Sequence, residues 1–183
     1  MHIVFREGLY RHAYDTQRRN MLDFLTLYES YATEVYRFAF WLTGNSTEAE
    51  DITSETFIRA WVRRNGIRTE TLKGYLFTIA RNVYLENQRK RRQHVALEDV
   101  YPDPALGPDK LIESRLELLR VQKVLQALPE IDRAAFIMRV QHELSYAEIA
   151  RVLGLSLTAT KVKVHRVRKR LLTDRIEREV SLL

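Results

Sequence analysis

The residues with the clearest chemistry lie near the end of the chain, where cations are concentrated. Residues 161–170 read KVKVHRVRKR, so seven of ten side chains carry a basic nitrogen. Thr160, Val164, Val167 and Leu171 recur at spacings of four, three and four residues, which is typical of the buried stripe of a helix. Lys and Arg side chains on the other faces of such a helix can bind phosphate groups. The pattern therefore predicts a helix that contacts nucleic acid.

A helix and a turn are predicted immediately before this basic helix. Ser145 and Glu148 have the spacing of a capping box, so a helix should begin there. Gly154 can adopt the left-handed conformation at which that helix ends, and Ser156 or Thr158 can cap the next one. Two helices joined in this way form a helix-turn-helix, whose second helix enters the major groove of DNA. The alternative is a solvated basic helix on an ordinary helical bundle.

The composition narrows the possible classes of protein. The chain has 183 residues, 30 Lys plus Arg, 24 Asp plus Glu and a formal net charge of +6, which favours a polyanionic partner. It has no cysteine, so disulfides, thiolate metal sites and cysteine nucleophiles are excluded. The five histidines are scattered without metal-ligand spacing, and no phosphate-binding glycine loop occurs. We therefore expect neither an enzyme nor a bound cofactor or metal.

Apolar stretches in the sequence are all short. None approaches the length of a membrane span, and the first residues lack the apolar segment of a signal peptide. We therefore expect no membrane insertion and a cytoplasmic location.

Helical periodicity also dominates the first half of the chain. In residues 21–42 apolar side chains recur at helical spacing, and Gly44 ends the predicted helix. Asn45 with Glu48 has the spacing of a second capping box, so a second helix should begin there and bury a stripe of apolar and small residues. A third helix is expected over residues 70–92.

The predicted third helix carries aromatic and basic side chains on one face. Phe77, Arg81, Tyr84, Gln88 and Arg92 fall together on a helical wheel. Aromatic rings among guanidinium and amide groups can stack on exposed bases while the cations hold the backbone, which suits single-stranded or melted DNA. The alternative is that Phe77 and Tyr84 pack against the N-terminal arm. The basic run that ends this helix favours nucleic acid.

The predicted second helix carries the opposite charge. Asp51, Glu55 and Arg59 recur every four residues, and Glu48 lies at the N-terminus of the same face. The helix dipole favours acidic residues in a first turn, which alone can account for Glu48 and Glu50. An acidic stripe on a protein that binds DNA must nevertheless face away from the DNA. We therefore expect it to bind a basic surface of a protein partner.

A change in composition divides the chain. Pro102, Pro104 and Pro108 lie close together, and no helix survives that density of proline. Helical spacing resumes near Leu111. We therefore predict an all-α chain with an arm at residues 1–19, a helical domain at residues 20–92, a Pro-rich linker at residues 93–110, and a second helical domain with the helix-turn-helix at residues 111–183.

Three motifs in this order resemble one family. They are AEDITSETFIRAW at residues 49–61, LKGYLFTIARNVYLENQRKRR at residues 72–92, and the helix-turn-helix segment at residues 128–171. They are similar to the polymerase-binding, promoter-melting and minus-thirty-five-reading parts of bacterial extracytoplasmic-function (ECF) sigma factors, members of the sigma-70 superfamily. The resemblance covers residues 20–172. It implies a protein that directs core RNA polymerase to specific promoters and assists DNA melting.

The resemblance also implies a role for three sets of residues and for the loop at residues 65–71, which would capture a flipped base. Those expected to dock on the clamp helices of the large polymerase subunit are Asp51, Glu55, Phe57 and Arg59. Those expected to hold the minus-ten element and melted DNA are Asn65, Arg68, Arg81, Asn82, Tyr84, Gln88, Arg89, Arg91 and Arg92. Those expected on the recognition helix for duplex DNA are Thr158, Ala159, Lys161, Val162, Lys163, His165, Arg166 and Arg168. The implied partners are core RNA polymerase, duplex and melted promoter DNA, and an anti-sigma protein.

A stand-alone helix-turn-helix regulator with a sensing or dimerising N-terminal domain is the alternative. It would use the same basic helix. It would leave the acidic second helix and the aromatic-basic third helix without a role.

Overall fold

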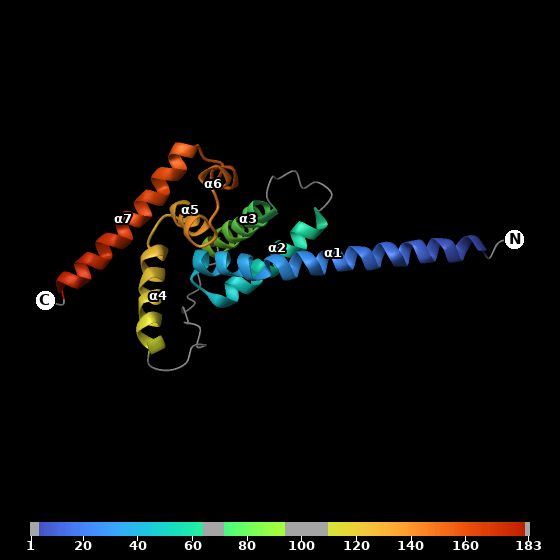
Figure 1. Cartoon of the computed structure of the whole chain (residues 1–183), viewed down its shortest axis with the longest axis horizontal. Helices are drawn as coiled ribbons and strands as arrows, with labels where there is room; N and C mark the ends of the chain where they lie inside the picture. Colours follow the sequence, from blue (N-terminus) through green and yellow to red (C-terminus); the bar gives the residue numbers. More distant parts are fainter. Residues whose placement is uncertain (1–3, 64–71, 94–109, 182–183) are drawn as a thin grey trace. The chain divides into compact units, whose positions relative to one another are not determined.

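The computed structural model describes residues 4–63, 72–93 and 110–181, with the side chains of residues 24–63, 72–91 and 116–177. Within these ranges the chain is helical and contains no strand, which confirms the predicted all-α class (Figure 1). The helices are α1 (Val4–Thr43), α2 (Ser46–Val62), α3 (Leu72–Gln93), α4 (Lys110–Gln126), α5 (Glu130–Val140), α6 (Tyr146–Leu153) and α7 (Leu157–Ser181). None of these helices combines the length and the apolar character that crossing a bilayer requires.

The chain divides into two compact units, residues 1–33 and residues 34–183. The first unit contains the N-terminal part of α1, which is helical from Val4 onward. The sequence predicts a regular helix from Met21 and, for residues 1 to about 18, either a flexible arm or a short helix. In the structure one continuous helix runs from Val4 through both parts. Leu25 and Tyr28 belong to the predicted apolar stripe but are exposed.

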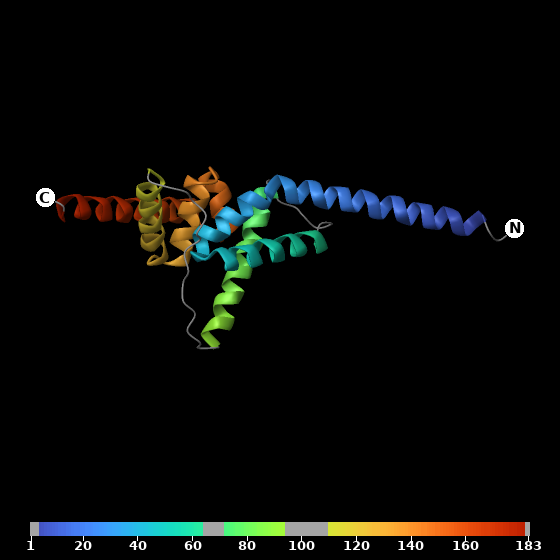
Figure 2. The same cartoon turned by 90° about the horizontal axis from the view of Figure 1, so that it is seen from below.

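The second unit begins with the last part of α1, in which Val35, Phe38, Ala39 and Leu42 are fully buried. The Phe38 ring of α1 stacks on the Phe77 ring of α3, with ring centroids 4.7 Å apart. Burying a large apolar side chain in this way stabilises a fold by about 1.5–3 kcal/mol. α2 and α3 lie against each other (Figure 2). The buried side chains shared by these helices are Val35, Phe38, Ala39, Leu42, Ala49, Ile52, Thr56, Phe57, Ala60, Leu76, Phe77, Ile79, Ala80 and Val83.

Local capping determines where α1 ends and α2 begins. Gly44 follows α1 with a φ of 76°, a left-handed conformation that favours glycine. The side chain of Asn45 accepts a 2.8 Å hydrogen bond from the backbone N–H of Glu48, as the capping spacing predicts. The Glu48 carboxylate does not complete a capping box, because it accepts a hydrogen bond from Arg91 instead.

Helices α5, α6 and α7 form the predicted helix-turn-helix region. The capping box of Ser145 and Glu148 is complete, with hydrogen bonds of 3.2 and 2.8 Å. Gly154 ends α6 with a φ of 65°. Ser156, rather than Thr158, caps α7 by accepting a hydrogen bond from the N–H of Ala159 at 3.1 Å. These local features confirm the predicted turn.

Helices from the two predicted domains meet in the second unit, where α3 contacts α6. The predicted linker at residues 93–110 lies almost wholly outside the described residues, so the division at that segment stays a prediction.

Candidate nucleic-acid interface and acidic docking face

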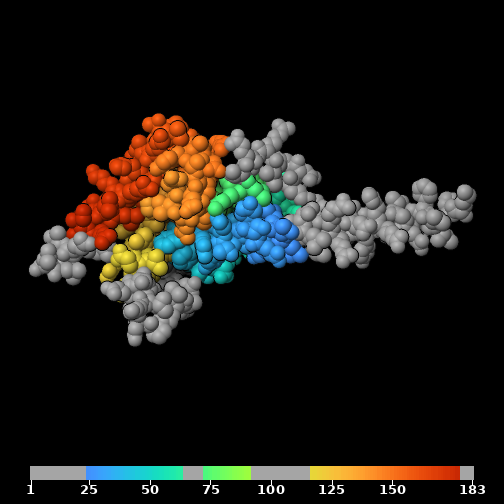
Figure 3. Space-filling view, viewed as in Figure 1, coloured from blue at the N-terminus to red at the C-terminus, as the bar shows by residue number. Residues whose placement is uncertain are grey.

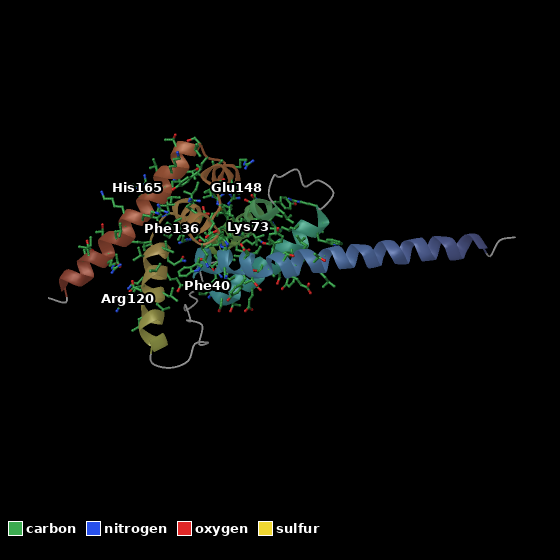
Figure 4. The ribbon with its side chains drawn as sticks, in the orientation of Figure 1. Phe40, Lys73, Arg120, Phe136, Glu148 and His165 are labelled. Atoms are coloured by element: carbon green, nitrogen blue, oxygen red, sulfur yellow. The ribbon has the colours of Figure 1, made fainter. Side chains whose placement is uncertain are left out.

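The basic helix α7 is held by one buried stripe and presents its cations outward. Thr160, Val164 and Val167 are buried against the unit, as their spacing predicts, whereas Leu171 of the same predicted stripe is half-buried. The space-filling view shows α7, in orange to red, on the surface of this unit (Figure 3). Its predicted DNA-binding side chains are mostly exposed, namely Thr158, Lys161, Val162, His165, Arg166 and Arg168, whereas Ala159 and Lys163 are half-buried. Figure 4 labels His165 among them.

A buried carboxylate anchors two of these cations. Asp132 of α5 accepts a hydrogen bond from Lys163 Nζ at 2.7 Å and another from Arg166 Nη1 at 3.0 Å. The Asp132 side chain is 1% exposed, whereas that of Arg166 is 59% exposed. Arg166 can therefore still reach a phosphate, while Lys163 mainly joins α7 to α5. The sequence does not predict this role of Asp132. The helix dipole alone accounts for an acidic residue in the first turn of a helix, and no local pattern identifies a partner 31 residues later.

The middle of α3 does not present its aromatic rings to solvent. Phe77 is 0% and Tyr84 7% exposed, so the prediction that they are available to stack on bases is wrong for this conformation. Phe77 packs on Phe38 and edge-on against the His142 ring, with centroids 4.7 and 4.6 Å apart. The Tyr84 hydroxyl accepts a 2.9 Å hydrogen bond from Arg133, and burial raises the pKa of Tyr84. Periodicity placed these rings on one face but could not identify what covers that face.

The rest of α3 remains more open. Asn82 and Arg89 are exposed, and Gln88 is half-buried. Arg91 is exposed and donates a 3.0 Å hydrogen bond to Glu48 of α2. Arg81 is half-buried and donates two hydrogen bonds to Glu130 of α5, at 2.7 and 2.8 Å. Asn65, Arg68 and Arg92, which are also predicted to hold melted DNA, lie outside the described side chains.

Glu48 is an acidic residue inside the unit rather than on its surface. Its side chain is buried, and burial raises the pKa of the carboxyl although the nearby Arg91 lowers it. One carboxylate oxygen of Glu48 has no hydrogen-bond partner within the described residues. Glu48 is therefore part of the packing of α2 against α3.

The exposed face of α2 combines charge with apolar side chains. Asp51 is exposed, and Glu55 accepts a 2.6 Å hydrogen bond from Arg59. Arg59 also donates two hydrogen bonds to Glu86 of α3 at 2.9 and 2.8 Å. These bonds to Glu86 and Glu55 raise the pKa of Arg59 above its usual value and hold α2 against α3. Phe57 is buried in the core, so it can support this face but cannot contact a partner from it.

Two exposed apolar residues on this face were not predicted from the sequence. Ile58 and Val62 are 56% and 75% exposed. They follow Asp51 and Glu55 by seven residues each, so they lie along the same side of the helix. The spacing is present in the sequence, but spacing alone does not show that these two side chains are exposed. We define the acidic docking face as Asp51, Glu55, Ile58 and Val62.

Comparison with known proteins identifies the family of this chain. Residues 27–94 match the family model for sigma-70 region 2, and residues 118–171 match the model for sigma-70 region 4. The chain is 31% identical over 135 residues to the ECF RNA polymerase sigma factor EcfG of Rhodopseudomonas palustris, covering 73% of this chain and 75% of EcfG. The chain belongs to the ECF sigma factors. The resemblance seen in the sequence is thus confirmed.

Other relatives of this sigma factor give the same result. It is 36% identical over 151 residues to the ECF sigma factor SigE of Mycolicibacterium smegmatis, covering 79% of this chain and 58% of SigE. Among solved structures it is similar to the sigma factor RpoE of Bartonella quintana in complex with the anti-sigma factor NepR. That match has a TM-score of 0.70 at 29% identity, and it covers 81% of this chain and 94% of RpoE.

Proposed function

We propose that this ECF sigma factor directs core RNA polymerase to promoters with three separate surfaces. The acidic docking face of α2 binds polymerase, α7 reads duplex DNA, and the basic end of α3 holds the melted strand. The observation that carries the proposal is that an exposed acidic and apolar face and an exposed cationic helix occur in one chain. A stand-alone regulator would have no use for the first of these surfaces.

The acidic docking face suits a basic helical surface such as the clamp helices of the large polymerase subunit. Asp51 and Glu55 supply charge that steers association and orients the partner. Ile58 and Val62 supply apolar area, which is the larger source of affinity at the centre of an interface. Arg59 and Phe57 contribute indirectly, because they hold α2 in place.

The recognition helix α7 suits the minus-thirty-five element. Its exposed cations neutralise phosphates and make binding dependent on salt. Sequence is read by side chains that reach base edges in the groove, for which Thr158, Lys161, Val162 and His165 are candidates. Replacing Arg166 and Arg168 with Ala should weaken binding uniformly across sequences. It should also reduce the slope of log affinity against log salt by roughly two, one unit for each phosphate that is no longer neutralised.

In this proposal, melted promoter DNA binds to α3 and to the loop before it. Unstacking a base costs a few kcal/mol, which is offset when the base is captured in a pocket. Asn82, Arg89 and Arg91 are described residues that can hold the strand, and Arg81 and Tyr84 join them when the middle of α3 is uncovered. This sigma factor carries out no reaction of its own in this scheme and acts with polymerase in the cytoplasm.

An anti-sigma protein is a further proposed partner. The supporting observation is that the similar RpoE of Bartonella quintana was solved with the anti-sigma factor NepR.

Transcription by reconstituted holoenzyme tests the proposal. Bacterial core polymerase with and without the chain is allowed to transcribe genomic DNA, and the RNA starts are sequenced. We expect new starts that share two upstream elements and that decline with Arg166→Ala/Arg168→Ala. Identical starts with and without the chain would contradict the proposal.

A further inference from the structure

Tyr146, the first residue of α6, lies beside a cation of α7. The Nζ atom of Lys161 lies over the Tyr146 ring, 6.0 Å from its centroid, a distance at which an aromatic ring attracts an ammonium group. Lys161 is exposed, whereas Tyr146 is half-buried. Because α7 begins at Leu157, Lys161 belongs to its N-terminal part, the part of such a helix that contacts base edges in DNA. The first helix of the helix-turn-helix thus places an aromatic ring beside a cation at the reading end of the second.

The Tyr146 ring is itself held by α5 and by the start of α6. The guanidinium of Arg139 lies over the same ring, with Cζ 5.0 Å from the centroid. Arg139 also donates a 2.9 Å hydrogen bond to the carbonyl oxygen of Leu144, in the turn before α6. The capping box of Ser145 and Glu148 fixes the first turn of α6, to which Tyr146 belongs. The ring therefore has a defined position in the free chain.

The ring differs in charge from the other group that orients cations of α7. Asp132 accepts hydrogen bonds from Lys163 and Arg166, and its negative charge partly neutralises theirs. A DNA phosphate must compete with that carboxylate for the two cations. The face of an aromatic ring attracts a cation through its quadrupole and carries no net charge, so Lys161 keeps its full charge. Tyr146 can therefore orient Lys161 and still leave its ammonium group available to DNA.

We propose that Tyr146 is a positioning residue for duplex DNA reading, which acts by orienting Lys161. A Lys side chain has a long flexible stem, and ordering it on DNA costs conformational entropy. The ring restricts this freedom before binding, so less entropy is lost when Lys161 reaches acceptor atoms on base edges, such as guanine O6 and N7. This inference rests on the proposed reading of duplex DNA by α7.

The contact itself is measured in the full chain by the NMR signals of Lys161. A ring current shifts protons above an aromatic ring upfield. The Lys161 Hε protons should therefore be shifted upfield in wild type and in Tyr146→Phe, and should return to ordinary lysine positions in Tyr146→Leu. Lys169, another exposed lysine of α7, is the internal control, and its signals should be the same in all three proteins. Ordinary positions for Lys161 in wild type would overturn the inference.

The functional consequence is measured with the full chain and the duplex that wild type enriches most from a random-sequence library. Tyr146→Leu should weaken binding to this duplex roughly threefold, the size of the attraction between a cation and an exposed ring. Tyr146→Phe keeps the ring and should bind as wild type does, which also shows that position 146 tolerates substitution. In a Lys161→Ala background Tyr146→Leu should cause no further loss, because residues that act through each other are not additive. In the matched Arg168→Ala background, which removes another exposed cation of α7, the full loss should persist.

The same measurements separate the inference from its alternatives. A loss in Tyr146→Leu that persists in the Lys161→Ala background would mean that Tyr146 supports packing or contacts DNA itself, and would overturn the inference. Equal losses in Tyr146→Phe and Tyr146→Leu would assign the effect to the hydroxyl group and would overturn it as well. If wild type enriches a duplex but Tyr146→Leu binds it equally well, the positioning role alone is overturned. If wild type enriches no duplex, the proposed reading of DNA by α7 fails, and the role of Tyr146 fails with it.

Discussion

Asp132 accepts a 2.7 Å hydrogen bond from Lys163, a residue 31 positions later that belongs to α7. The same carboxylate accepts a second bond from Arg166 at 3.0 Å. Both of its oxygens are satisfied although the side chain is 1% exposed. The orientation of α7 on α5 therefore depends on a buried charge as well as on apolar packing.

Replacing Asp132 with Ala should lower the free energy of unfolding by about 2 kcal/mol, because two cations lose their partner but can be partly rehydrated. Urea unfolding followed by circular dichroism measures the loss. Glu143→Ala, at an exposed position, is the control and should change the free energy by less than about 0.5 kcal/mol. Equal effects would mean that the Asp132 pairs contribute nothing to stability.

Two glycines with the same conformation should respond differently to Ala. Gly44 and Gly154 have φ values of 76° and 65°, so Ala at either position is strained by about 1 kcal/mol. A Cβ at Gly154 would meet no atom within 4 Å, whereas one at Gly44 would lie 3.1 Å from the Gln126 side chain. Gln126 donates a hydrogen bond to the carbonyl of Trp41, so displacing it adds to the cost. Gly44→Ala should therefore be the more destabilising in urea unfolding, and the reverse order would contradict the packing of Gln126.

Stability should decrease as the pH falls below the ordinary pKa of His142. Burial lowers the pKa of His142 from its usual value of 6.5, while Glu34 acts to raise it and Lys73 and Arg37 act to lower it. The folded state therefore keeps the neutral imidazole where the unfolded chain binds a proton. The stability that His142 contributes is therefore fully present above pH 6.5. It is lost as the pH falls from 6.5 toward the lower pKa that His142 has in the folded chain.

The test for His142 compares wild type with His142→Gln by urea unfolding at a series of pH values from about 7.5 to 5.5, a range that brackets an ordinary His. Because the pKa of Glu48 is raised, its contribution to stability increases as the pH falls, opposite to that of His142. The informative quantity is therefore the difference in unfolding free energy between wild type and variant at each pH. Wild type should lose more stability across this range than the variant. If the unfolding free energies of the two proteins changed in parallel with pH, the lowered pKa of His142 would be contradicted.

The apolar part of the acidic docking face gives a prediction about binding. Ile58→Ser should weaken binding to core polymerase roughly tenfold, since an apolar residue at an interface centre commonly contributes more than 1 kcal/mol. Its side chain is exposed in the free chain, so stability should change little. Val140→Ser, at a similarly exposed residue of α5, is the matched control and should bind normally. If both variants lost polymerase affinity equally, the placement of the polymerase-binding surface on α2 would be contradicted.

The features that the sequence predicts correctly are local ones. The capping of α6 by Ser145 and Glu148, its end at Gly154 and the buried stripe of α7 depend on residues within one or two turns of each other. Their chemistry can be recognised from spacing alone.

The features that could not be predicted from the sequence are contacts between distant residues. The pairing of Arg81 with Glu130 joins positions 49 residues apart, and neither residue has a pattern that identifies its partner. For the same reason the helical wheel groups Phe77 with Tyr84 but cannot show that Phe38 and His142 pack on Phe77 or that Arg133 bonds to Tyr84. The sequence could not distinguish a flexible arm from a helix before Met21, because the first residues lack a clear apolar period.

Binding of the labelled chain to bacterial core RNA polymerase, in competition with a housekeeping sigma factor, tests the central claim most directly. We predict tight binding that the competitor displaces, and its loss in Asp51→Lys/Glu55→Lys, which changes two side chains outside the core. Absence of binding by a folded chain free of any inhibitor would contradict the claim. Binding that the charge-reversed variant retains would contradict the placement of the docking face on α2.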